Sequence, residues 1–183
     1  MIYNQNPRTI FYYRYQPLTP EWRENPDDNG FALTVFEDGR AYFSLFNGRE
    51  HVIKQDLYQL TDSFRVRYLE ELKLADRWLG SVPQQMTLPP QYVTRFRSQI
   101  GLDGYPLIFC DDIAHLTKAP FGDEMGRCAR RLCMLLEDIA ELLKMQGLTL
   151  TPYGFTFDAA VARTVSSNTM DQPFTTPNAV VNY

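Results

Sequence analysis

Residues 31–54 carry short apolar runs separated by two turn-forming dipeptides. Asp38-Gly39 and Asn47-Gly48 both tolerate the positive φ angles that tight hairpin turns require. The runs between them are rich in residues that favour strands. The pattern therefore predicts a three-stranded antiparallel meander over about 31–54.

The register of this meander depends on the length of its first turn. With Asp38-Gly39 as a two-residue loop, Phe36 would face Ala41 and Val35 would face Tyr42. In that register both faces of the sheet carry apolar residues. A sheet with one solvent-exposed face would instead alternate apolar and polar residues along each strand. We therefore expect something to cover each face.

Further elements flank the meander. Stretches 9–16 and 148–157 are rich in strand-forming residues and predict two strands added to the antiparallel sheet. Apolar residues at helical spacing predict three helices, at about 62–79, 90–100 and 123–146. Together these elements predict an α+β fold in which the helices pack against the sheet.

The length and composition of the chain suit one globular domain. Its 183 residues can bury a core, and the absence of a compositional break predicts a single α+β domain over 1–165. Residues 166–183 are polar and rich in Ser, Thr, Asn and Pro, which predicts an extended tail.

Charge and cysteine content narrow the class of protein. The net charge of −4 argues against an extended nucleic-acid surface, which needs clustered Lys and Arg. No long charge-free apolar run predicts a membrane span. Three cysteines and no visible signal peptide favour the cytoplasm.

Asp111, Asp112 and His115 form the one local group that could hold a metal. If this stretch is helical, Asp111 and His115 share a face at a spacing of four residues, which suits capture of a metal ion. In the simpler interpretation an aspartate caps a short helical turn and His115 lies at the surface. We favour the simpler interpretation and expect no cofactor.

His51 is the other histidine of the chain. In the expected register it would face Ser44, a pairing that could supply a nucleophile and a base. A pair in the middle of a strand is more often a structural cross-strand contact, which is the interpretation that we favour.

The N-terminal region combines aromatic residues with arginines, namely Tyr12, Arg14, Tyr15, Trp22 and Arg23. Such side chains can stack on a nucleobase or on the side chains of a protein partner. The alternative is an edge strand that packs its aromatic residues inward. We favour this alternative, and we keep these five residues as the best candidate surface for a partner or a small ligand.

The sequence favours a non-catalytic protein-binding or interaction module, such as an inhibitor, an immunity-type protein, an adaptor or an assembly subunit. Its partner would be another protein or a further copy of the chain. One alternative is a metal-dependent hydrolase or phosphoesterase that uses Asp111, Asp112 and His115. A second is a small-ligand or nucleotide binder that uses the surface of Arg14, Tyr15, Trp22 and Arg23.

Overall fold

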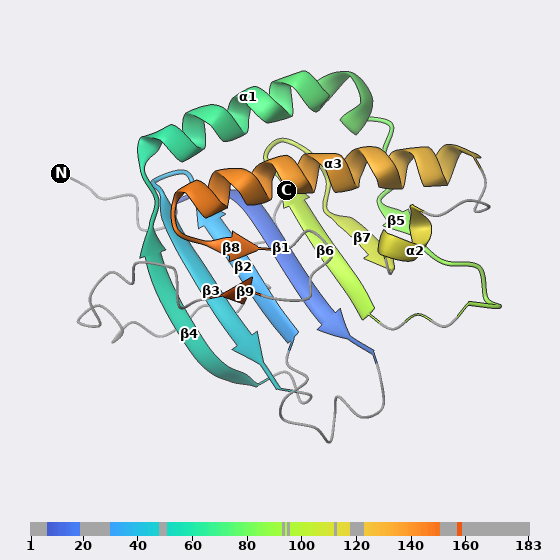
Figure 1. The fold of residues 1–183 in the computed structure, drawn as a ribbon, viewed down its shortest axis with the longest axis horizontal. Helices are drawn as coiled ribbons and strands as arrows, with labels where there is room; N and C mark the ends of the chain where they lie inside the picture. Colours follow the sequence, from blue (N-terminus) through green and yellow to red (C-terminus); the bar gives the residue numbers. More distant parts are fainter. Residues whose placement is uncertain are drawn as a thin grey trace.

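The computed structural model describes residues 7–18, 30–47, 51–92, 94, 96–111, 113–117, 123–150 and 157–158. It shows an α+β fold in which two long helices lie on one face of a seven-stranded sheet (Figure 1). The helices are α1 (Asp62–Leu79), α2 (Ile113–Leu116) and α3 (Asp123–Met145). The strands of the sheet are β1 (Thr9–Pro17), β2 (Gly30–Phe36), β3 (Arg40–Phe46), β4 (Val52–Gln59), β5 (Gln85–Met86), β6 (Phe96–Leu102) and β7 (Ile108–Asp111).

Strand β1 lies at the centre of the sheet, whose order is β4-β3-β2-β1-β6-β7-β5. Neighbouring strands pair antiparallel except β5, which runs parallel to β7, so the sheet is mixed. The predicted meander is present as β2, β3 and β4, although its third strand runs to Gln59 and not to 54, and the strand predicted over 9–16 is confirmed as β1.

The helices predicted over 62–79 and 123–146 are confirmed as α1 and α3. Their apolar faces join the sheet in one core. After α3 the chain reverses at Gly147, whose φ of +84° lies in the left-handed region. The backbone N–H of Leu148 then donates to the carbonyl of Leu143 at 2.9 Å, the bond typical of a Schellman ending.

The helix predicted over 90–100 is wrong, because this stretch contains most of strand β6. Alternate residues of β6 are buried: Phe96, Ser98, Ile100 and Leu102. Ser98 hides this alternation in the sequence, yet it is buried because its hydroxyl lies 3.3 Å from the hydroxyl of Tyr13, within hydrogen-bond distance. The chain then turns at Asp103-Gly104, where Gly104 has a φ of +82°, and returns as β7.

The strand predicted over 148–157 does not extend the main sheet. Its described parts belong to β8 (Thr149–Leu150) and β9 (Phe157–Asp158), which pair with each other in a separate two-stranded sheet. Residues 151–156 lie outside the described residues.

The first turn of the meander is one residue longer than expected. Val35 pairs with Ala41, so the loop spans residues 37–39. Gly39 has a φ of +86°, and its N–H donates to the carbonyl of Phe36 at 3.0 Å, as in a three-residue turn closed by a left-handed glycine. The predicted register is therefore wrong by one residue, which moves every side chain of β3 to the other face.

The observed register gives the sheet two unlike faces. On the meander, the helix face carries Phe31, Leu33, Val35, Ala41, Phe43 and Leu45, which belong to or pack against the main core. The second face carries Ala32, Thr34, Phe36, Tyr42, Ser44 and Phe46. Both long helices lie on the helix face (Figure 1). The expected cover of the second face stays a prediction.

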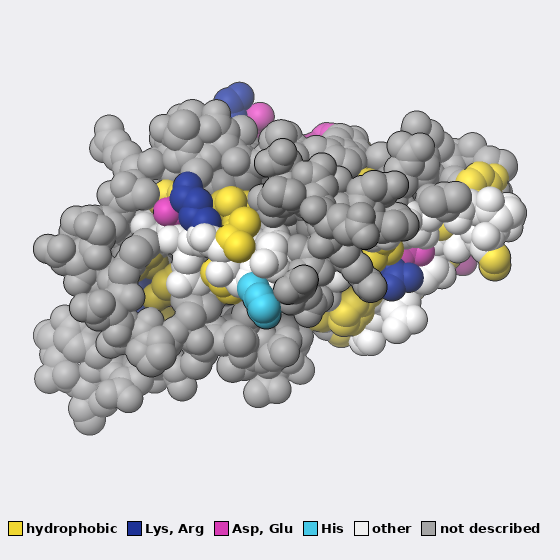
Figure 2. Space-filling model, turned by 90° about the horizontal axis from the view of Figure 1, so that it is seen from below, with side chains coloured by type: hydrophobic (Ala, Val, Ile, Leu, Met, Phe, Trp, Pro, Cys, Tyr) yellow, Lys and Arg dark blue, Asp and Glu magenta, His cyan; other side chains and the backbone are white. Residues whose placement is uncertain are grey.

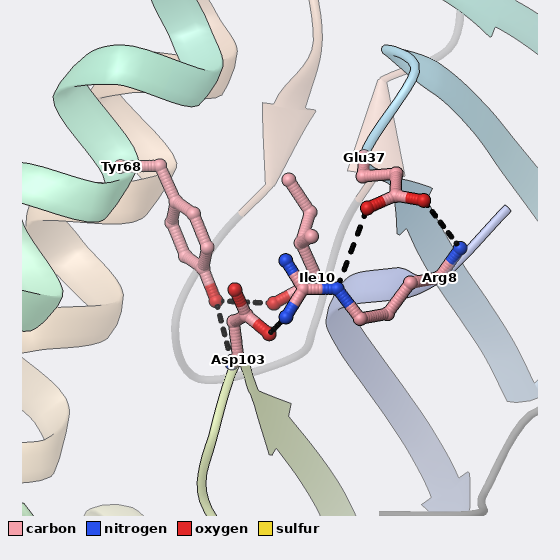
Figure 3. A network of polar contacts seen from close by, with 5 residues as sticks. All are labelled: Arg8, Ile10, Glu37, Tyr68 and Asp103. Atoms are coloured by element: carbon pink, nitrogen blue, oxygen red, sulfur yellow. Dashed lines mark hydrogen bonds and ion pairs between the residues drawn. The ribbon is translucent and has the colours of Figure 1, made fainter.

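A polar network ties the start of β1 to three other elements (Figure 3). Arg8 donates from Nη1 to Asp103 at 2.8 Å, and from its backbone N–H and Nε to Glu37 at 3.2 and 3.4 Å. Tyr68 of α1 donates its hydroxyl to the carbonyl of Ile10 and accepts the backbone N–H of Asp103 at 3.3 Å. The network fixes the central strand to α1 and to the turns that follow β2 and β6.

Two further expectations remain open. Residues 166–183 lie outside the described residues, and the single domain over 1–165 stays a prediction.

Within the part of the chain that the structure describes, none of the helices has both the length and the apolar character needed to cross a membrane.

Candidate functional site

The centre of the second face holds a small cluster of buried side chains. Tyr12, Ala32 and Phe46 are 2%, 3% and 4% exposed, and Leu107 packs against them. These residues come from β1, β2, β3 and the turn before β7, so four segments meet here. The cluster gives the second face an apolar centre that is separate from the main core.

Arg14 lies beside this cluster, with its guanidinium over an aromatic ring. Its Cζ is 5.0 Å from the centre of the Phe46 ring, within the range of a cation–π interaction. Burial raises the pKa of the Tyr12 hydroxyl, and the positive charge of Arg14 acts in the opposite direction. Arg14 and Phe46 together therefore place a positive charge against an aromatic ring on this face.

A second pair of the same kind lies toward the opposite end of this face. The Cζ of Arg40 is 5.9 Å from the centre of the Phe36 ring, and Tyr42 meets that ring edge-on at 5.6 Å. The Nε of Arg40 also lies 2.7 Å from the carboxylate of Asp38 in the adjacent turn. Arg40 is thus held from two sides while 35% of its side chain stays exposed.

A third arginine follows on β6. The Nε of Arg97 donates to Oδ1 of Asp111 at 3.1 Å, and 62% of the Arg97 side chain is exposed. Arg97 pairs with Asp111 across β6 and β7 on the second face. Three arginines therefore lie on one face of a chain whose net charge is −4.

The structure brings together only part of the surface predicted from the N-terminal sequence. Tyr12 and Arg14 lie on the second face, but Tyr15 points to the helix face, where its ring stacks on Phe31 at 5.5 Å. Strand β1 is central, so the edge position of the alternative is wrong, but its inward packing of aromatic residues is confirmed by Phe11 and Tyr13, which belong to the main core. Trp22 and Arg23 lie outside the described residues, and the nucleotide-binding hypothesis stays a prediction.

The carboxylate of Asp111, one of the predicted metal ligands, is engaged on both oxygens. Besides the bond from Arg97, Oδ2 accepts the backbone N–H of Leu88 at 3.0 Å. Its side chain is only 6% exposed. This arrangement joins β6 and β7 to the segment that follows β5, which is a structural role.

The other two predicted metal ligands cannot be compared with this geometry. Asp112 lies outside the described residues, and the side chain of His115, in α2, is not described. Within the described ranges, no three His, Cys, Asp or Glu side chains lie close enough to hold a metal ion. The metal-dependent alternative stays a prediction.

The predicted pairing of His51 with Ser44 is wrong. Ser44 pairs with Gln55, whose side-chain amide donates to the Ser44 hydroxyl at 3.3 Å. His51 precedes β4 and is exposed, and its backbone N–H donates to the side chain of Asn47 at 3.0 Å. The two residues therefore do not form a nucleophile and base.

Sequence reasoning missed four residues of the second face: Phe36, Arg40, Tyr42 and Phe46. In the expected register, Tyr42 and Phe46 fell on the face opposite to Phe36. A three-residue turn at 37–39 would have placed them together. The signal was present in the glycine at the third loop position, which suits a left-handed turn residue.

Comparison with protein-family models found no match, and comparison with curated proteins found no significant similarity.

Proposed function

We propose that the chain is a non-catalytic, cytoplasmic protein-binding module and that its partner binds the second face of the sheet. The proposal is supported mainly by the two arginine–aromatic pairs on that face, Arg14 with Phe46 and Arg40 with Phe36. Arginine and aromatic residues are enriched where protein interfaces gain most of their binding free energy.

The chemistry of these pairs indicates the kind of partner. A guanidinium held on an aromatic ring loses less side-chain entropy on binding than a free one. Arginine can bind a carboxylate in a bidentate geometry that lysine cannot provide. Arg97 lies on the same face, and 62% of its side chain is exposed although its Nε binds Asp111, so the surface suits a protein that presents acidic side chains beside apolar ones.

The second face also exposes an aromatic side chain. Among the described residues, basic side chains lie close to hydrophobic ones where the molecule is seen from below (Figure 2). On the second face Phe109, in β7, is 45% exposed, and its register partner on β6 is Gln99. A mixed surface of this type is typical of transient protein interfaces.

The test begins with capture of a partner from an extract of the source cells. The captured protein is identified by mass spectrometry and purified, and its binding is measured by calorimetry. We expect Arg14→Ala and Arg40→Ala each to raise the Kd roughly tenfold or more. Arg67→Ala, which removes an exposed arginine from α1, is the matched control and should leave the Kd unchanged.

The proposal fails if the purified partner binds both second-face variants as tightly as the wild type. It also fails if the loss of Arg67 weakens binding as much as the loss of Arg40, because the effect would then be one of net charge.

A further inference from the structure

The two edges of the sheet differ in length. At one edge β5 contributes two residues, and at the other β4 contributes eight. Among the described residues, no strand other than β3 pairs with β4. A long edge strand offers a row of backbone donors and acceptors to another chain.

The hydrogen-bond alternation of β4 identifies which backbone groups face outward. The N–H of Leu60 donates to the carbonyl of Gly39 at 2.8 Å, so even-numbered residues next to it are bonded to β3. In an antiparallel ladder the intervening residues direct their backbone groups the other way. The N–H and carbonyl of Gln55 and Leu57 therefore face away from β3.

The side chains of β4 carry opposite charges two residues apart. Lys54 and Asp56 both point to the helix face, where their register partners are Leu45 and Phe43. Their Nζ and Oδ2 atoms are 3.3 Å apart. Oδ2 of Asp56 is shielded from solvent, and it has no hydrogen-bond partner within the described part of the chain. The exposed part of this ion pair is mainly Lys54, whose side chain is 52% exposed, against 13% for Asp56.

We propose that two copies of this chain pair antiparallel along β4, with Gln55 opposite Gln55 of the second copy. In this register Lys54 of each copy lies opposite Asp56 of the other, at the positions where side chains approach most closely. On the second face, Ile53, which is 51% exposed, lies opposite Leu57. The product is one continuous sheet with the helices of both copies on the same side.

The charges of Lys54 and Asp56 destabilise the neighbouring registers of this strand pair. Centring the pair on residue 54 or 56 would place two lysines or two aspartates opposite each other, which is destabilising. Centring it on Leu57 would leave the charges opposite apolar or aromatic side chains. Charges that point inward on an edge strand commonly prevent its pairing with another chain. In β4 the charges of Lys54 and Asp56 disfavour these neighbouring registers, but they match in the register centred on Gln55.

The experiment measures the dissociation constant of the full chain by sedimentation equilibrium. We expect a dimer for the wild type, and a Kd raised about tenfold or more by Lys54→Glu, which places two like charges opposite each other. The double variant Lys54→Glu with Asp56→Lys restores opposite charges and should return the Kd toward the wild-type value. Lys73→Glu, on the exposed side of α1, is the control and should not change it.

A backbone variant tests the edge without altering these charges. Gln55→Pro removes an N–H that faces away from β3, so the monomer should keep its circular dichroism spectrum while the dimer is lost. A wild type that stays monomeric overturns the proposal. So does a dimer that withstands Gln55→Pro, or a double variant that dimerises no better than Lys54→Glu. None of these results bears on partner binding at Arg14 and Arg40, since neither residue belongs to β4.

Discussion

The two faces of the sheet are built from alternate residues of the same strands, yet they differ in chemistry. Along β3, the helix face takes Ala41, Phe43 and Leu45, and the second face takes Tyr42, Ser44 and Phe46. The helix face joins a continuous apolar core, whereas the second face combines a small buried cluster with arginines stacked on rings. Register, more than composition, therefore decides which residues stabilise the fold and which are available for recognition.

The largest expected effect compares one phenylalanine from each face. Phe43→Ala removes a ring that is 2% exposed and packs against Phe31 in the main core, so we expect a loss of about 3–5 kcal/mol in the free energy of unfolding. Phe36→Ala removes a half-buried ring from the second face and should cost roughly 1–2 kcal/mol. Urea unfolding followed by circular dichroism measures both losses. Equal losses would show that the two faces contribute alike to stability.

A smaller effect tests the turn that sets the register. In Gly39→Ala the new Cβ would lie 2.7 Å from the carbonyl oxygen of Leu60, at a φ of +86°, so we expect a loss of about 2–3 kcal/mol. Gly104→Ala is the matched control, because its φ of +82° is similar but no atom lies within 4 Å of the new Cβ. That variant should lose only about 1 kcal/mol. If the two variants lose the same amount in urea unfolding, the close approach at Gly39 has no energetic consequence.

The smallest effect concerns a tyrosine that joins the turn after β6 to α1. The hydroxyl of Tyr105 donates to the carboxylate of Asp76, and burial followed by this aspartate raises the pKa of Tyr105 to about 12. Tyr105→Phe should therefore cost about 1 kcal/mol at neutral pH.

The pH dependence of this bond has a definite sign. Since the pKa in the folded state lies above the ordinary value of 10, the stabilisation is complete below pH 10 and is lost as the pH rises through about 12. The stability difference between the wild type and Tyr105→Phe should shrink over that interval. A phenolate absorbance titration that gives Tyr105 an ordinary pKa would contradict the assignment.

The two long helices and the strands β1 to β4 could be predicted from the sequence, whereas β6 and the sheet to which the described parts of 148–157 belong could not. Helices α1 and α3 were predictable because each repeats apolar residues on one face over many turns. Strand β6 was missed because Ser98 interrupts its apolar alternation, and the reason for burying that hydroxyl is Tyr13, which lies 85 positions earlier. The predicted register was wrong because the turn has three residues where two were expected, and local residue preferences distinguish poorly between these two turn lengths.

The candidate site was only partly predictable for the same reason. Tyr12 and Arg14 were chosen from their types, and alternation along β1 would have separated them from Tyr15. Their partners on β3 could be found only from the correct register. The role of Asp111 depends on Arg97 and on the backbone of Leu88, contacts that cross between strands and leave no local pattern.

The central position of β1 determines how the protein can form on the ribosome. Strands β2, β3 and β4 emerge soon after β1 and can associate with one side of it while the rest of the chain is still being translated. The other edge of β1 pairs with β6, so the backbone N–H and carbonyl groups along that edge stay unpaired until β6 has been translated. Contacts between residues so far apart in sequence form slowly. A pause in translation before β6 should therefore lengthen the life of an incomplete sheet and favour its capture by chaperones.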